Sequence, residues 1–230
     1  VTVSTTQSGT NVRSLSTKRL EGTVSKDGTG VGTYRFAAGA QILDTDDSGG
    51  YARVYPSRLA GAKLSGEDVR YYTLNAAGEI DRMVLHNVTG DTQPYVYVSG
   101  IDDSSSGTNI SVSYTYLRDG QAQTISGTAR YPIQTGGAML VYEKDSLRSI
   151  RQLTQVSLDG LSALSAMGDG REYPIAENVQ VLLRDGSGSR GYYQTDLSQI
   201  NGEDYTLTGW YDDLGCSAGG RIRILVATPK

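Results

Sequence analysis

Apolar and polar residues alternate with a period of two along most of the chain, and Gly, Asp, Ser or Asn closes each alternating segment. Alternation places every second side chain on one face of a β-strand, and the closing residues are those of tight turns. The pattern therefore predicts strands joined by turns at residues 1–5, 20–25, 32–37, 51–56, 69–74, 95–100, 110–117, 205–211 and 221–227.

Helical periodicity is nearly absent. The best candidates for helix are residues 145–153 (DSLRSIRQL) and 159–167 (DGLSALSAM), and each is long enough for only one or two turns. The 29 glycines, and the 16 tyrosines against a single phenylalanine, also suit short strands and turns. We therefore expect an all-β fold with little helix.

An internal repeat is the strongest signal in the sequence. Residues 34–43 (YRFAAGAQIL), 131–140 (YPIQTGGAML) and 173–182 (YPIAENVQVL) share a tyrosine, an apolar residue two places on and an apolar pair ending in leucine. The first and third copies also share Gly-Glu-Asp, at residues 66–68 and 202–204. Repetition at this scale indicates a duplicated supersecondary unit whose copies bury a core together.

The repeat predicts tandem small bent sheets or partly open barrels. The leucine that ends each copy is expected to be buried in the core. These leucines are Leu43, Leu140 and Leu182. The Ser-, Gly- and Asp-rich residues 100–109 are expected to be a linker or surface loop. The expected organisation is an N-terminal β domain at 1–99 with copy 1 at 34–90, and a C-terminal β domain at 110–230 with copy 2 at 131–170 and copy 3 at 173–228.

Charge and cysteine content exclude several classes of protein. The net charge is -4 and no run of Lys or Arg forms a basic patch, so we expect no nucleic-acid partner. Cys216 is the only cysteine, which excludes an intramolecular disulfide and multi-cysteine metal sites. No apolar run reaches the roughly 18 residues of a membrane helix, so no membrane insertion is expected.

Two segments resemble a known family. Residues 71–91 (YYTLNAAGEIDRMVLHNVTGD) combine an Asn-x-x-Gly-Glu-Ile turn with a Val-Leu strand, and residues 209–227 (GWYDDLGCSAGGRIRILVA) combine a Tyr-Asp turn with Gly-Gly-Arg-Ile-Arg and an apolar strand. Both resemble the large extracellular region of clostridial (Firmicutes) cell-surface proteins that carry S-layer homology domains. The S-layer homology modules themselves are not recognisable here.

The resemblance implies an exported, wall-attached protein whose repeated β region projects outward. Because the chain starts without Met and directly in a strand-like pattern, we interpret it as a piece of a longer protein that is attached to the wall through other parts. The resemblance implies no catalytic residues.

One loop, LDTDDSGG at residues 43–50, reads like the first half of a calcium loop. The first, third, fifth and sixth positions of an EF-hand-type loop are filled by Asp44, Asp46, Ser48 and Gly49. Position twelve, however, is Tyr55 in place of the closing glutamate.

The third copy of the repeat serves as a control for this loop. There, Leu183 replaces Asp44, and only Asp185 keeps the carboxylate of Asp46. A hairpin turn explains both loops, and no cofactor is then needed. The alternative is a weak calcium site formed by Asp44, Asp46 and Asp47.

The aromatic residues allow a second kind of site. Strand tyrosines usually pack their rings against cross-strand neighbours and keep the hydroxyl wet. Alternatively, some form a platform on which sugar rings stack, and the candidates are Trp210, Tyr211, Tyr192 and Tyr193.

Catalytic chemistry has few candidate groups. His86 is the only histidine, so any Ser-His-Asp arrangement must include it. A glycosidase needs two carboxylates. The candidate acidic pairs are Glu67/Asp68 and Glu203/Asp204. They occupy corresponding loops of copies 1 and 3, which indicates that they stabilise turns and do not form two active sites.

The sequence thus predicts a non-catalytic structural or adhesive module of an exported bacterial cell-surface protein. A carbohydrate- or cell-wall-polymer-binding module is the first alternative and a hydrolase the second. The expected partner is a cell-wall glycan or another surface protein.

Overall fold

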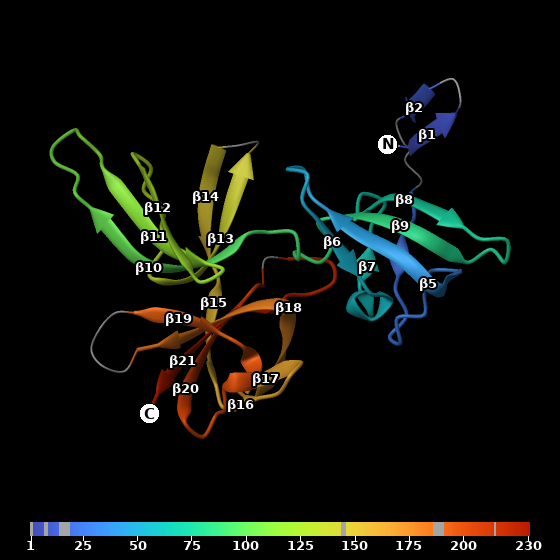
Figure 1. The fold of residues 1–230 in the computed structure, drawn as a ribbon. Helices are drawn as coiled ribbons and strands as arrows, with labels where there is room; N and C mark the ends of the chain where they lie inside the picture. The colour runs from blue at the N-terminus through green and yellow to red at the C-terminus, as the bar shows by residue number, and fades with distance from the viewer. Residues whose placement is uncertain (1, 7–8, 14–18, 144–145, 186–190, 214) are drawn as a thin grey trace. The chain divides into compact units, whose positions relative to one another are not determined.

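The structure is a computed structural model that describes residues 2–6, 9–13, 19–143, 146–185, 191–213 and 215–230. This part of the chain is nearly all β and forms curled, half-barrel sheets (Figure 1). The all-β prediction is confirmed. The only helices among the described residues are two short 3-10 helices, η1 (Pro56–Leu59) and η2 (Leu197–Gln199). No helix in the described part is long and apolar enough to cross a membrane.

The chain divides into two compact units. The N-terminal unit comprises Val1–Thr92 together with Cys216–Gly219, and the C-terminal unit comprises Gln93–Gly215 together with Gly220–Lys230. The division therefore falls at residues 92 and 93, ahead of the linker expected at residues 100–109. Those residues include the end of strand β10 (Tyr95–Asp103) and part of the turn to the next strand, where Ser104 N–H donates to the Ser111 carbonyl.

The N-terminal unit is built around one curled sheet. Its order is β4-β5-β9-β8, with β6 paired to the other end of β5. β8 and β9 form an antiparallel hairpin, whereas β5 and β9 run parallel. The strands are β1 (Thr2–Thr6), β2 (Gly9–Arg13), β3 (Gly22–Thr23), β4 (Gly30–Val31), β5 (Tyr34–Thr45), β6 (Tyr51–Val54), β7 (Lys63–Leu64), β8 (Val69–Leu74) and β9 (Ile80–His86).

A bulge bends the long strand β5. Phe36 pairs with Ile80 and Gln41 pairs with Arg82, so five steps of β5 (36 to 41) accompany two steps of β9 (80 to 82). Gly39, inside this bulge, has a φ of +77°, which a glycine adopts without strain. The bend lets one strand pair with β4 at its start and with β6 at its end. The sheet closes over a core that includes Ile42, Leu59, Ile80, Met83 and Leu85.

The C-terminal unit contains two sheets. One has the order β12-β11-β10-β13-β14, and the other has the order β15-β20-β21-β18-β17-β16 with β19 paired to β18. The remaining strands are β11 (Val112–Arg118), β12 (Gln121–Gly127), β13 (Gly136–Glu143), β14 (Ser146–Gln152), β15 (Thr154–Leu158), β16 (Gly160–Leu161), β17 (Ser165–Gly168), β18 (Arg171–Arg184), β19 (Tyr192–Thr195), β20 (Tyr205–Tyr211) and β21 (Ile222–Pro229).

Both faces of the central strands in this unit are covered. On β10, Val96 and Val98 face the core of the first sheet, while Tyr97 between them belongs to a cluster shared with the second sheet. This shared cluster consists of Tyr97, Leu117, Met139, Leu153, Leu182, Trp210, Ile224 and Val226. Side chains alternate between the two faces of each strand. Those that do not point into the core of their own sheet form this shared cluster, through which the two sheets pack against each other.

Copies 1 and 3 of the sequence repeat have the same strand arrangement. β18 pairs parallel with β21, and five steps of β18 (Ile175 to Gln180) accompany two steps of β21 (Ile222 to Ile224), as in the β5–β9 pair. In each copy a hairpin partner, a 3-10 helix and an antiparallel hairpin follow the bent strand. A common origin of these two copies stays a prediction.

Copy 2 is arranged differently. Its strand β13 begins only at Gly136, and it lies between β10 and β14 with both neighbours antiparallel. Tyr131 and Ile133, the matching positions of the sequence repeat, lie between β12 and β13, outside any strand. The three-copy repeat is therefore not confirmed.

The two expected helices are strands, so that prediction is wrong. Residues 146–152 form β14, where Leu147 pairs with Tyr142 and Ser149 pairs with Val141. The register shift at this point inserts one residue, so Leu147 and Ile150 come to lie three apart while both pack inward. A β-bulge thus imitates helical spacing. Within 159–167, Ser162 closes a turn between β16 and β17 by accepting from Ser165 N–H.

The three repeat leucines differ in burial, and this leads to a first prediction. Leu140 and Leu182 are 1% and 0% exposed, whereas Leu43 is 38% exposed because Ile42 and Asp44 take the inward positions of β5. The expectation that Leu43 is in the core was wrong. Leu140→Ala and Leu182→Ala should each lower the free energy of unfolding by about 2–5 kcal/mol. Leu43→Ala should change it by roughly 0.5 kcal/mol.

Urea unfolding curves of the three variants check this prediction. Leu43→Ala is the matched control because the chemical change is the same and only the burial differs. Equal losses in all three variants would contradict the assigned orientation of β5.

Candidate functional site

Asp44 is buried, and its carboxylate is used inside the fold. It is 0% exposed on β5. Its Oδ1 accepts from Val88 N–H at 3.1 Å, and its Oδ2 accepts from Thr89 N–H and from Thr89 Oγ1, each at 2.7 Å. These bonds hold the loop that follows β9 against β5. The carboxylate therefore replaces strand pairing at this point, since it satisfies buried backbone donors.

Asp46 and Asp47 have other partners. Asp46 Oδ1 accepts from Ser48 N–H at 2.9 Å and from Gly50 N–H at 2.7 Å, which is an Asx-type turn. Asp47 Oδ1 lies 2.7 Å from Arg70 Nη2 and 3.2 Å from His86 Nε2. The hydrogen bond from Arg70, with a smaller contribution from His86, holds the pKa of Asp47 below its usual value.

The three aspartates proposed for calcium thus point to three different sets of partners. Nowhere in the described part of the chain do three or more His, Cys, Asp or Glu side chains cluster in a way that could hold a metal ion. The geometry of this loop favours the turn interpretation.

His86 ends β9 and is engaged by its neighbours. Its Nε2 lies near Asp47 and 3.2 Å from Asn87 Nδ2. Among the described residues, no serine, threonine or cysteine is hydrogen-bonded to its ring. In the described part of the chain, the contacts of His86 are those of a strand-end residue held by Asp47 and Asn87.

The two acidic pairs lie in turns. Asp68 Oδ2 accepts from Ser65 N–H at 2.7 Å, and Asp204 Oδ2 accepts from Asn201 Nδ2 at 2.8 Å. Glu67 and Glu203 beside them are exposed. Asp68 and Asp204 therefore close the turns that precede β8 and β20.

The four aromatic candidates do not form one exposed row. Trp210 is 5% exposed and packs edge-on against Tyr97 at 5.2 Å, and Tyr192 packs against the same Tyr97 at 4.8 Å. Tyr211 packs against Tyr173 in the core of the second sheet. Tyr193 alone is largely exposed, at 59%. Burial and the hydrogen bond with Tyr192 raise the pKa of Tyr97 above its usual value.

The C-terminal unit contains a buried ion pair that was not predicted from the sequence. Arg223 and Asp212 are each 1% exposed, and Arg223 Nε and Nη2 both lie 3.0 Å from Asp212 Oδ2. Tyr95 donates its hydroxyl to the same oxygen at 2.7 Å, and its ring lies 4.6 Å from the guanidinium. A signal existed in the sequence, because Arg223 stands between Ile222 and Ile224 in a strand with both faces apolar.

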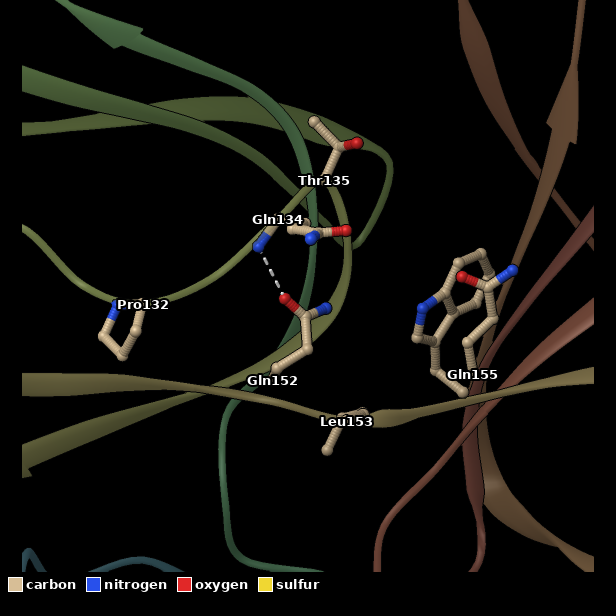
Figure 2. Close-up of a pocket in the computed structure, with 7 residues that line it drawn as sticks. Pro132, Gln134, Thr135, Gln152, Leu153 and Gln155 are labelled. Atoms are coloured by element: carbon tan, nitrogen blue, oxygen red, sulfur yellow. Dashed lines mark hydrogen bonds between the residues drawn. The ribbon is translucent and has the colours of Figure 1, made fainter.

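A cavity of about 290 Å³ lies in the C-terminal unit beside Trp210. Three segments line it: the approach to β13, the passage from β14 to β15, and β20. Figure 2 shows Gln155 facing Pro132, Gln134 and Gln152 across the cavity. The lining residues are Pro132, Gln134, Thr135, Gln152, Leu153, Gln155 and Trp210.

Of the residues that line this cavity, only Trp210 was a candidate from the sequence. Gln152 and Gln155 belong to different strands, and Gln155 faces Trp210 only because β15 pairs with β20. The sequence carries no signal for that pairing. Comparison with family models, curated proteins and solved structures gave no match to this chain.

Proposed function

We propose that this chain is a non-catalytic structural or adhesive module of an exported bacterial cell-surface protein. The observation that carries the structural role is the use of Asp44. The spacing of the acidic residues in this loop is like that of a calcium loop. The buried Asp44 carboxylate, however, accepts hydrogen bonds from Val88 N–H, Thr89 N–H and the Thr89 hydroxyl. His86 lies beside Asp47, and Asp68 and Asp204 close turns, so these groups are also used inside the fold, whereas Glu67 and Glu203 are exposed.

The cellular setting is proposed from the sequence. The resemblance of residues 71–91 and 209–227 to the extracellular region of S-layer-homology-containing proteins supports an extracellular location. Attachment to the cell wall would occur through parts of the parent protein outside this chain. The partner would be a cell-wall glycan or another surface protein.

A hydrolysis screen separates this proposal from the hydrolase alternative. The purified chain is incubated with cell-wall polysaccharide, ester and peptide substrates, beside the variants His86→Ala, Glu67→Gln and Glu203→Gln. We expect no turnover by the wild type. Turnover that one of these variants abolishes without lowering the melting temperature would contradict the proposal.

The adhesive role is tested by sedimentation with insoluble cell walls of a Gram-positive bacterium. Walls extracted to remove their secondary polymers serve as the control. Co-sedimentation with intact walls and its loss on extracted walls would identify a wall polymer as the partner. Equal sedimentation with both would contradict recognition of a secondary polymer.

A carbohydrate-binding module is the second candidate function, and the cavity beside Trp210 favours it. Small-ligand sites are concave and combine aromatic and apolar surface with a few placed polar groups. The cavity has an indole, a proline and a leucine together with three glutamines and a threonine.

A further inference from the structure

The indole of Trp210 has an unused donor at the cavity. The residue is 95% buried, yet its N–H has no hydrogen-bond acceptor among the residues that the structure describes. Trp210 Nε1 is not one of the fully buried side-chain atoms without a partner, so this N–H is open to water or to another molecule. Because Trp210 lines the cavity, a molecule bound there can supply this acceptor.

Two glycines keep the space beside the indole open. A Cβ at Gly136 would lie 2.7 Å from Trp210 Nε1, and a Cβ at Gly137 would collide with the Trp210 side chain. Gly136 also has a φ of +138°, which other residues rarely adopt. The backbone of β13 therefore approaches the ring more closely than any other residue type would allow.

The glutamines of the cavity have two different roles. Gln152 is fixed, because its Oε1 accepts from Gln134 N–H at 2.8 Å and its Nε2 donates to the Gly137 carbonyl at 2.9 Å (Figure 2). The side-chain amides of Gln134 and Gln155 are exposed, and neither has a hydrogen-bond partner in the described part of the chain. Each offers one acceptor and two donor hydrogens, which suits neighbouring hydroxyl groups.

Charge and volume restrict the ligand. The seven described residues that line the cavity are all uncharged. A charged ligand would lose hydration here with no opposite charge to compensate it. The volume of about 290 Å³ is close to the lower limit, about 300 Å³, of small-ligand sites, which fits a single ring better than an extended chain.

We infer that this cavity binds one neutral sugar residue of a glycan. The Trp210 N–H donates to a ring substituent, Gln134 and Gln155 bond to ring hydroxyls, and Pro132 and the indole contact the apolar face of the ring. The inference rests on the second candidate function, carbohydrate binding.

Intrinsic fluorescence tests this inference directly, because Trp210 is the only tryptophan of the chain. The full chain is titrated with glucose, galactose, mannose, N-acetylglucosamine and N-acetylgalactosamine. N-acetylneuraminic acid is the charged comparator and a capped alanine tripeptide is the peptide comparator. We expect a saturable fluorescence change with at least one neutral sugar and none with the two comparators.

Matched variants locate the binding. Gln155→Leu should weaken the sugar by about tenfold or more, the effect of losing roughly one hydrogen bond. Gln121→Leu, on the edge strand β12 and away from the cavity, should leave the affinity unchanged. Because Gln155 and Gln121 are both exposed, neither change should unfold the protein.

Several results would overturn the inference. They are the absence of a saturable change with every neutral sugar, equal affinity in wild type and Gln155→Leu, or preferential binding of the acid or the peptide. Sedimentation of Gln155→Leu with cell walls separates this failure from that of the carbohydrate-binding function. If wild type and variant both bind walls equally well, the function stands and the cavity is not its site.

Discussion

Replacing Asp212 by alanine is expected to lower the free energy of unfolding by about 3–5 kcal/mol. The substitution removes the carboxylate that neutralises Arg223, whose side chain is 1% exposed. It also removes the acceptor of the Tyr95 hydroxyl. A charge left in a buried site without its counter-charge is strongly destabilising, whereas the intact pair need not stabilise the fold at all.

Urea unfolding followed by Trp210 fluorescence measures this effect, because Trp210 and the ion pair belong to the same compact unit. The double variant Asp212→Leu, Arg223→Met should recover most of the loss, since it removes both charges.

An exposed ion pair provides the control. Arg130 Nε lies 2.8 Å from Asp103 Oδ2, and the hydrogen bonds of Arg130 and Ser105 lower the pKa of Asp103 to about 2. Asp103→Ala should cost less than about 1 kcal/mol, because solvent screens exposed pairs. Equal losses for Asp212→Ala and Asp103→Ala would contradict the burial of the Asp212–Arg223 pair.

Replacing Asp44 by alanine is expected to have the second large effect, also about 3–5 kcal/mol. Val88 N–H, Thr89 N–H and the Thr89 hydroxyl would lose their acceptor, and both residues are 0% exposed. Each buried donor left unsatisfied costs about 1–3 kcal/mol, and relaxation of the loop reduces the total below the simple sum. Circular dichroism in urea measures the loss, and amide exchange at Val88 and Thr89 should become faster.

Asp46→Ala is the matched control two residues away. Asp46 accepts bonds only within an exposed turn, so we expect a loss of roughly 0.5–1 kcal/mol. Thermal melts of the wild type and of both variants, with excess calcium and with EDTA, separate the turn from a metal site. If calcium raised the melting temperature of the wild type but not of Asp46→Ala, the metal alternative would be correct.

Much of the secondary structure could be predicted from the sequence. The alternating segments at 51–56, 69–74, 95–100, 110–117, 205–211 and 221–227 all overlap strands, although 51–56 extends beyond the end of β6 at Val54 into η1. The failures have two causes. At residues 146–152 a bulge changed the spacing of apolar residues, and at Leu43 the alternation was right but the choice of inward face was wrong.

In the candidate sites, the sequence indicated the local contacts but not the long-range ones. The Asp46 turn is local, because its partners lie two and four residues away, and the sequence was sufficient to indicate it. Asp44 bonds to residues 44 and 45 positions further along the chain, and Tyr95 reaches Asp212 across 117 positions. No local pattern predicts such contacts.

The sequence by itself determined that this protein is built from short strands and Asp- and Gly-rich turns, because alternation and turn chemistry act within a few residues. The tertiary structure decided which face of each strand is buried, which carboxylates bond to the backbone, and where Gln155 meets Trp210. These features depend on strand register and on packing between sheets, which long-range contacts set.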